Sequence, residues 1–101
     1  MPQNPIVPRP GGSLSSLNVS AKTVVKASAG TVWRVVVNTA ATGGTFGVYD
    51  AATTTTAAAD QIFVASSSWP AAGTVLYLEF PCSNGIVVDP GTGGNVSVSY
   101  A

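Results

Sequence analysis

The chain has 101 residues, a formal net charge of zero and only 8% charged residues, whereas 46% of its residues are hydrophobic. This length suits one small domain, and four scattered basic residues give no basic patch for nucleic acid. The chain has no histidine and one cysteine, so it lacks the usual general base, a zinc ligand set and an internal disulfide. We therefore expect no enzyme activity, no cofactor and no metal.

Neither a membrane span nor a secretory signal is expected. No apolar run approaches 18 residues, and the first residues, MPQNPIVPRPGG, do not place a positively charged segment before an apolar run and a small-residue cleavage site. Together with the single cysteine, this favours a protein that is made and kept in a reducing cytoplasm, or assembled there into something larger.

Residues 1–16 differ from the rest of the chain because they contain four closely spaced prolines. Proline fixes φ and removes an amide donor, which favours an extended or polyproline II path. We interpret this segment as an arm, with Ile6 and Val7 as the apolar pair that a groove on a neighbouring protein could hold. A disordered leader is the alternative, since disorder concentrates at termini.

From residue 17 onward the pattern predicts β-strands separated by Gly and Pro turns. The expected strands are 17–27, 30–39, 45–51, 61–68, 73–80, 85–90 and 95–101. About seven short strands at spacings of roughly ten residues are typical of an all-β protein, here a single small antiparallel β-sandwich over residues 17–101. The first three strands lie close enough in sequence to form a consecutive antiparallel meander.

Alternation within these strands predicts which side chains face the interior. The residues expected to point inward are Trp33, Val35, Val37, Phe46, Val48, Leu76, Leu78, Phe80, Val96, Val98 and Tyr100. The residues expected to point outward are Arg34, Tyr49, Tyr77 and Glu79. The run of valines around Arg34 therefore needs no pocket to explain it.

Few residues offer chemistry. Cys82 has no histidine to activate it and no cationic cluster near it in sequence, so a buried, inert thiol is expected. Asp50 and Asp60 flank a Thr-rich loop, but calcium usually takes six to eight oxygen ligands, so two carboxylates more simply make the loop soluble. Trp69 precedes a proline in a loop, where it is either a lid over the sandwich end or an anchor for a partner.

Several short motifs together resemble small structural proteins of tailed bacteriophages. They are Val25, Lys26, Gly30, Val35, Val37 and Asn38, then Val48, Tyr49 and Asp50, then Gly85, Ile86 and Val88, and finally Val98, Ser99 and Tyr100. The resemblance covers residues 17–101. It implies a capsid decoration, or cement, protein with a jelly-roll-like sandwich, dimeric or trimeric, that binds the major capsid protein on the capsid exterior. The residues themselves leave open a jelly-roll or an immunoglobulin-like strand order. It implies no catalytic residues.

The candidate protein-contacting residues come from composition alone. They are Pro5, Ile6, Val7, Pro8, Arg9 and Trp69. A second hypothesis places the same sandwich in a tail or fibre, where it would bind a receptor or glycan through exposed aromatic residues, Trp69 above all.

Overall fold

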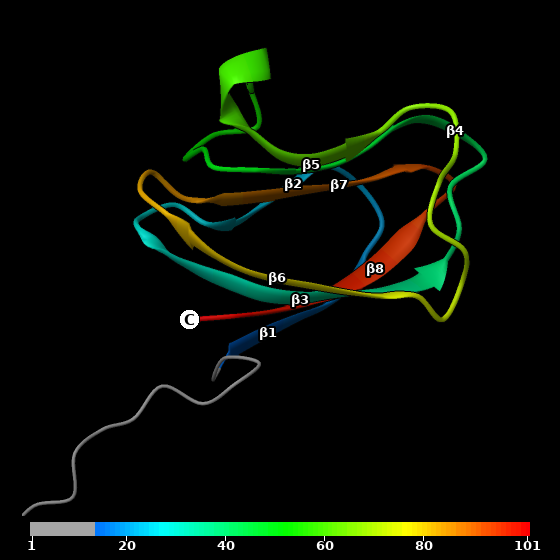
Figure 1. Ribbon diagram of the computed structural model, residues 1–101, viewed down its shortest axis with the longest axis horizontal. Coiled ribbons are helices and arrows are strands. Elements are labelled where there is room, and N and C mark those ends of the chain that lie inside the picture. Colours follow the sequence, from blue (N-terminus) through cyan, green and yellow to red (C-terminus); the bar gives the residue numbers. More distant parts are fainter. Residues whose placement is uncertain (1–13) are drawn as a thin grey trace, which may run out of the picture.

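Val is the most frequent residue in the strands of this chain, because β-branched side chains pack well on a pleated surface. The computed structural model describes residues 14–101 and shows two antiparallel sheets of four strands packed face to face (Figure 1). The elements are β1 (Leu14–Val19), β2 (Thr23–Lys26), β3 (Gly30–Thr39), β4 (Gly43–Tyr49), the 3₁₀ helix η1 (Ala58–Asp60), β5 (Gln61–Ala65), β6 (Val75–Cys82), β7 (Ile86–Thr92) and β8 (Asn95–Tyr100). The all-β sandwich predicted from the sequence is confirmed.

The strand order identifies the topology. One sheet has the order β1-β8-β3-β6 and the other β2-β7-β4-β5, which is the eight-stranded jelly-roll arrangement. The predicted meander is wrong, because β2, β3 and β4 alternate between the two sheets. The predicted strand 17–27 is two strands, since the chain leaves β1 at Val19 and crosses to the opposite sheet before Thr23. Strand β1 also includes Leu14 to Ser16, which lie at the end of the predicted arm.

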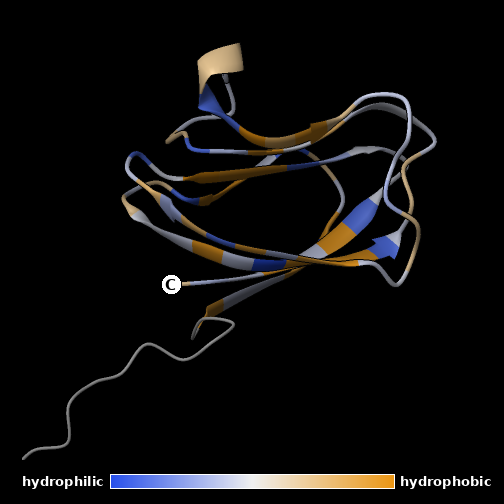
Figure 2. Cartoon of the chain, viewed as in Figure 1, coloured by the Kyte–Doolittle hydropathy of each residue, from blue (hydrophilic) through white to orange (hydrophobic). Residues whose placement is uncertain are grey.

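The core lies between the two sheets. Figure 2 shows apolar stretches in strands of both sheets, and their inward side chains meet in one cluster. Its buried members are Val19, Val32, Val35, Val37, Phe46, Val48, Cys82, Ile86, Val88, Val96 and Val98. Phe46 meets Phe63 edge to face, with 6.0 Å between ring centroids. Most of the predicted inward residues are therefore confirmed.

A β-bulge in β3 changes which residues face the core. Val32 pairs with Tyr100 and Arg34 pairs with Ser99, so β3 has one residue more than β8 at this point. A bulge of this kind breaks the inside–outside alternation. Val32 is fully buried in place of Trp33, which is not among the residues packed against the core. The predicted inward orientation of Trp33 is wrong.

Edge strand β6 carries a second irregularity. Glu79 has a φ of 47°, and the pairing of β6 with β3 shifts between Val32 and Arg34. Phe80 pairs with buried Val32 but is 42% exposed, because it lies at the open edge of the sheet. The expectation that Phe80 belongs to the core is therefore not met.

Candidate interaction surface

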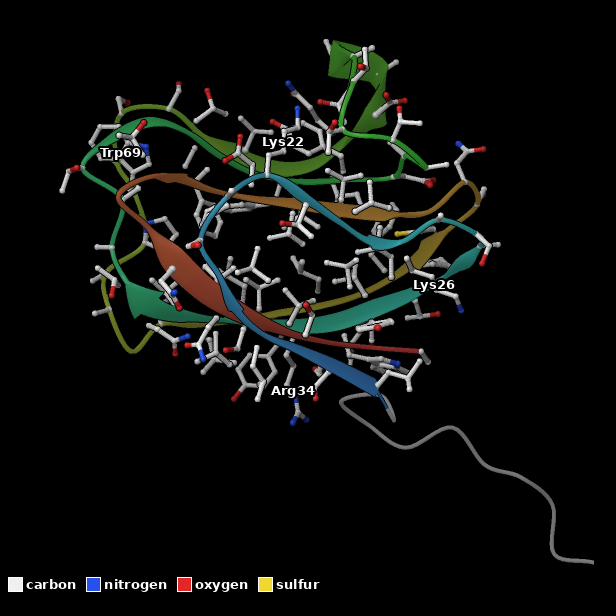
Figure 3. The ribbon with its side chains drawn as sticks, turned by 180° about the vertical axis from the view of Figure 1, so that it is seen from behind. Lys22, Lys26, Arg34 and Trp69 are labelled. Carbon is white, nitrogen blue, oxygen red and sulfur yellow. The ribbon has the colours of Figure 1, made fainter. Side chains whose placement is uncertain are left out.

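Trp69 lies at one end of the sandwich (Figure 3). Its ring is half-buried against the core, and its indole N–H donates a hydrogen bond of 3.1 Å to the carbonyl oxygen of Gly44. This is the lid arrangement rather than a free anchor. The other predicted contact residues, Pro5, Ile6, Val7, Pro8 and Arg9, lie outside the described residues.

The outer face of the β1-β8-β3-β6 sheet carries a group of apolar and aromatic side chains. Register places Arg34 opposite Tyr77 and Val36 opposite Val75 across β3 and β6. Leu17 on β1 and Tyr77 on β6 are 69% and 68% exposed. We call this surface the aromatic face, and its residues are Leu17, Trp33, Arg34, Val36, Val75 and Tyr77.

Arg34 is the charged member of the aromatic face. Its side chain points away from the interior of the sandwich (Figure 3), as predicted, and its guanidinium carbon lies 5.2 Å from the centroid of the Tyr77 ring. A cation over a ring is attracted by the negative face of the π system. The pair therefore presents an aromatic surface with a positive charge held against it.

Two polar groups on β3 and β8 have no hydrogen-bond partner among residues 14–101. The indole N–H of Trp33 and the hydroxyl oxygen of Ser99 are buried, and neither forms a hydrogen bond with the part of the chain that the structure describes. Burying a polar group without a partner costs about 1–3 kcal/mol. The Trp33 N–H and the Ser99 hydroxyl on this sheet therefore have unused hydrogen-bonding capacity.

Part of the outer face of the other sheet is covered by the chain itself. Figure 1 shows η1 standing above the β2-β7-β4-β5 sheet. Tyr49 points outward as predicted, yet it is only 6% exposed. The ammonium nitrogen of Lys22 lies 4.9 Å from the Tyr49 ring centroid and donates to Thr56 at 2.7 Å. Tyr49 also clusters with Ala51 and Val87, whereas the large hydrophobic side chains exposed within residues 14–101 all lie in β1 and β6, on the sheet of the aromatic face.

A carboxylate organises the turn between β6 and β7. Asp50 accepts hydrogen bonds from the backbone N–H groups of Ser83, Asn84 and Gly85, at 3.0, 2.8 and 3.3 Å. Burial acts to raise the pKa of Asp50, but the three donors outweigh burial and leave the pKa below its ordinary value. Asp50 therefore has a structural role that the sequence did not reveal.

The described residues contain few side chains that could bind a metal or act as a nucleophile. Within residues 14–101, no three His, Cys, Asp or Glu side chains gather as a metal-binding group. Cys82 is buried, as predicted. The search for membrane spans over the same residues found no helix long and apolar enough to cross a bilayer.

Sequence reasoning missed the aromatic face because it needs the pairing of β3 with β6. The signal was present in the alternation, since Arg34 and Tyr77 were both predicted to point outward. Only the register shows that the two residues are neighbours and that Val36 and Val75 extend their surface.

Comparison of the chain with protein-family models, with curated proteins and with solved structures found no match.

Proposed function

We propose that this protein is a capsid decoration, or cement, protein of a tailed bacteriophage. In this role it binds the outer surface of the capsid and bridges neighbouring subunits of the major capsid protein. The observation that carries the proposal is the aromatic face, a sheet surface on which the apolar side chains Leu17 and Tyr77 are exposed within residues 14–101. Exposed apolar surface of this kind marks sites of contact with other proteins, and the resemblance of residues 17–101 to phage structural proteins supplies the setting.

The composition suits a protein that works in many copies. A net charge of zero lets neighbouring copies crowd together without strong repulsion. Subunits joined in a dimer or trimer bind a repeating lattice with an effective concentration far above their bulk concentration, so weak single contacts add up. The proposed partners are the major capsid protein and further copies of this chain, on the exterior of a virion assembled from proteins made in the host cytoplasm.

Rebinding to stripped particles tests the proposal. Phage capsids freed of this protein should take it up again to a fixed number of copies per capsid, and electron micrographs should place it on the outer capsid surface. The same chain without residues 1–13 tests the arm, and we expect it to bind more weakly. A position on the tail, or uptake that never saturates, would contradict the proposal.

A tail or fibre module that binds a receptor or glycan is the second candidate. The exposed ring of Tyr77 favours it, because sugar rings commonly pack against aromatic faces, but Trp69 is held by Gly44 and packs on the core. Binding on a glycan array that is lost in Tyr77→Ala and kept in Trp69→Ala would support this candidate. The micrographs separate it from the capsid role.

A further inference from the structure

The aromatic face and the proline-rich segment at the N-terminus have complementary chemistry. We infer that the aromatic face binds residues 5–10, PIVPRP, of a second copy of this chain. This inference deepens the proposed function and rests on it only for the assumption that several copies sit side by side. It names the partner of the face, a neighbouring subunit, and the segment that the neighbour contributes.

The first argument is the match between a proline-rich segment and aromatic side chains. Residues 5–8 have the spacing Pro-x-x-Pro, and such segments dock on aromatic-lined surfaces because their polyproline II path is already largely ordered. Tyr77 offers an exposed ring. Val36 and Val75 offer apolar surface beside it for Ile6 and Val7, and Leu17 lies at the opposite edge of the same sheet.

The second argument is hydrogen bonding. A polyproline II backbone has no internal hydrogen bonds, so its carbonyl oxygens are free to accept. The indole N–H of Trp33 has no acceptor among the described residues. This N–H is buried, so binding requires the Trp33 ring to turn toward the segment, where a carbonyl partner would remove the cost of leaving the N–H unpaired.

The third argument is charge. Arg9 directly follows the second proline of the Pro-x-x-Pro spacing. Glu79 is exposed on β6, two residues after Tyr77. A segment that lies over Tyr77 can therefore place Arg9 against Glu79, while Arg34 stays over the Tyr77 ring. The pair also fixes the direction in which the segment lies.

The dimensions also agree. The four strands of the sheet span three inter-strand gaps, roughly 14 Å, and six residues of polyproline II extend roughly 19 Å. Residues 1–13 can reach roughly 45 Å from Leu14 when extended, which is enough to cross to a neighbouring subunit. A footprint roughly 14 Å by 17 Å, exchanged reciprocally between two copies, would bury on the order of 950 Å² in total, which is the size of a weak, reversible interface.

Sedimentation velocity of the full chain over a range of concentrations tests the inference. We expect a reversible oligomer whose dissociation constant rises about tenfold or more in Ile6→Ser/Val7→Ser and in Tyr77→Ser. The matched control is Gln3→Ser/Asn4→Ser, which changes the same segment outside residues 5–10 and should leave the constant within about twofold. Because Tyr77 is 68% exposed, its replacement leaves the core intact, and unfolding curves verify this.

Two further variants test specificity. Arg9→Glu and Glu79→Arg should each weaken association, and the double variant should restore it, because the charges are exchanged. Ile6→Ser/Val7→Ser mixed with Tyr77→Ser should associate although each is mainly monomeric alone. Each mixed pair contains one intact segment and one intact face, and this complementation occurs only if the segment binds another copy.

Three outcomes would overturn the inference. They are a wild-type chain that is monomeric at all concentrations, an oligomer that none of these variants weakens, and a mixture that shows no complementation, as expected if the segment docks on its own sheet. Capsid rebinding is measured separately. A chain that is monomeric but still binds capsids would contradict only the binding of residues 5–10 to a second copy. A chain whose copies associate through residues 5–10 but which does not bind capsids would contradict the proposed function.

Discussion

Cys82 illustrates how position decides the reactivity of a residue. Burial, and after it the negative charge of Asp50, raise the pKa of the thiol to about 11, although a backbone hydrogen bond from Val32 acts in the opposite direction. Only the thiolate is a good nucleophile. We therefore expect no reaction of the native protein with Ellman's reagent at about pH 8, and full reaction of this single thiol after unfolding. Rapid labelling of the native protein would contradict the buried position.

The same raised pKa gives a dependence of stability on pH. The unfolded thiol ionises near its ordinary value of 9.0, whereas the folded thiol ionises near 11. The thiol's contribution to stability is therefore fully present below about pH 9 and is lost as the pH rises toward 11. Cys82→Ala removes this contribution, so its urea midpoint should change less over this range than that of the wild type. Parallel curves for the two proteins would contradict the shift.

Asp50 should stabilise the turn before β7 through its charge. Asp50→Asn keeps the shape of the side chain but weakens three hydrogen bonds from backbone N–H groups, so we expect the free energy of unfolding at neutral pH to fall by about 1–2 kcal/mol. Asp89→Asn is the matched control, because Asp89 accepts one backbone N–H, from Gly91. Urea unfolding should show a smaller loss for the control.

The Asp50 contribution should depend on pH with a definite sign. Because the pKa of the folded carboxyl lies below its ordinary value of 3.8, the contribution is present above that value and is lost as the pH falls through the folded pKa. The difference in unfolding free energy between wild type and Asp50→Asn should therefore be constant from about pH 5 to 7 and shrink below about pH 4. An equal difference at about pH 3 would rule out the charge as the cause.

At the scale of the elements, β4 depends on a glycine that makes room for an aromatic ring. A Cβ atom built on Gly47 would lie 2.6–2.7 Å from the ring and hydroxyl atoms of Tyr49. Gly47→Ala would therefore displace the ring from under Lys22, and we expect a loss of about 1–3 kcal/mol in unfolding free energy. Gly43→Ala on the same strand is the control, because its Cβ would meet Thr92 at an ordinary 3.6 Å. Equal stabilities of the two variants would contradict this packing.

The strands themselves were predictable, whereas their irregularities were not. β-branched runs and Gly or Pro turns reveal where strands lie, and alternation placed Val35, Val37, Val96 and Val98 in the core correctly. A bulge adds one residue without changing the local composition, so nothing in GTVWRVVVNT shows that Val32 rather than Trp33 turns inward. At the bulge, between Val32 and Arg34, the register of β3 shifts against both of its neighbours, β6 and β8.

At the scale of the whole molecule, sheet membership depends on contacts between distant segments. Strand β1 pairs with β8, and β2 pairs with β7, so, apart from β4 and β5, strands that follow each other in sequence are not neighbours in the sheets. Local patterns carry no information on this choice, which explains why the meander was predicted in place of the jelly roll. For the same reason, the sequence predicted only individual contact residues, such as Trp69. The aromatic face consists of residues from strands that are far apart in sequence, so it is visible only in the structure.

The pairing of the first strand with the last predicts how truncation affects the fold. All eight strands lie within residues 14–101, so at low concentration a chain without residues 1–13 should melt within a few degrees of the full chain. A chain without residues 1–19 also loses buried Val19 and leaves β8 as an open edge. We expect its Tm to fall by roughly 10 °C or more, and we expect it to aggregate through the exposed edge. Scanning calorimetry compares the three proteins, and similar melting of the shortest chain would show that β1 contributes little to the sandwich.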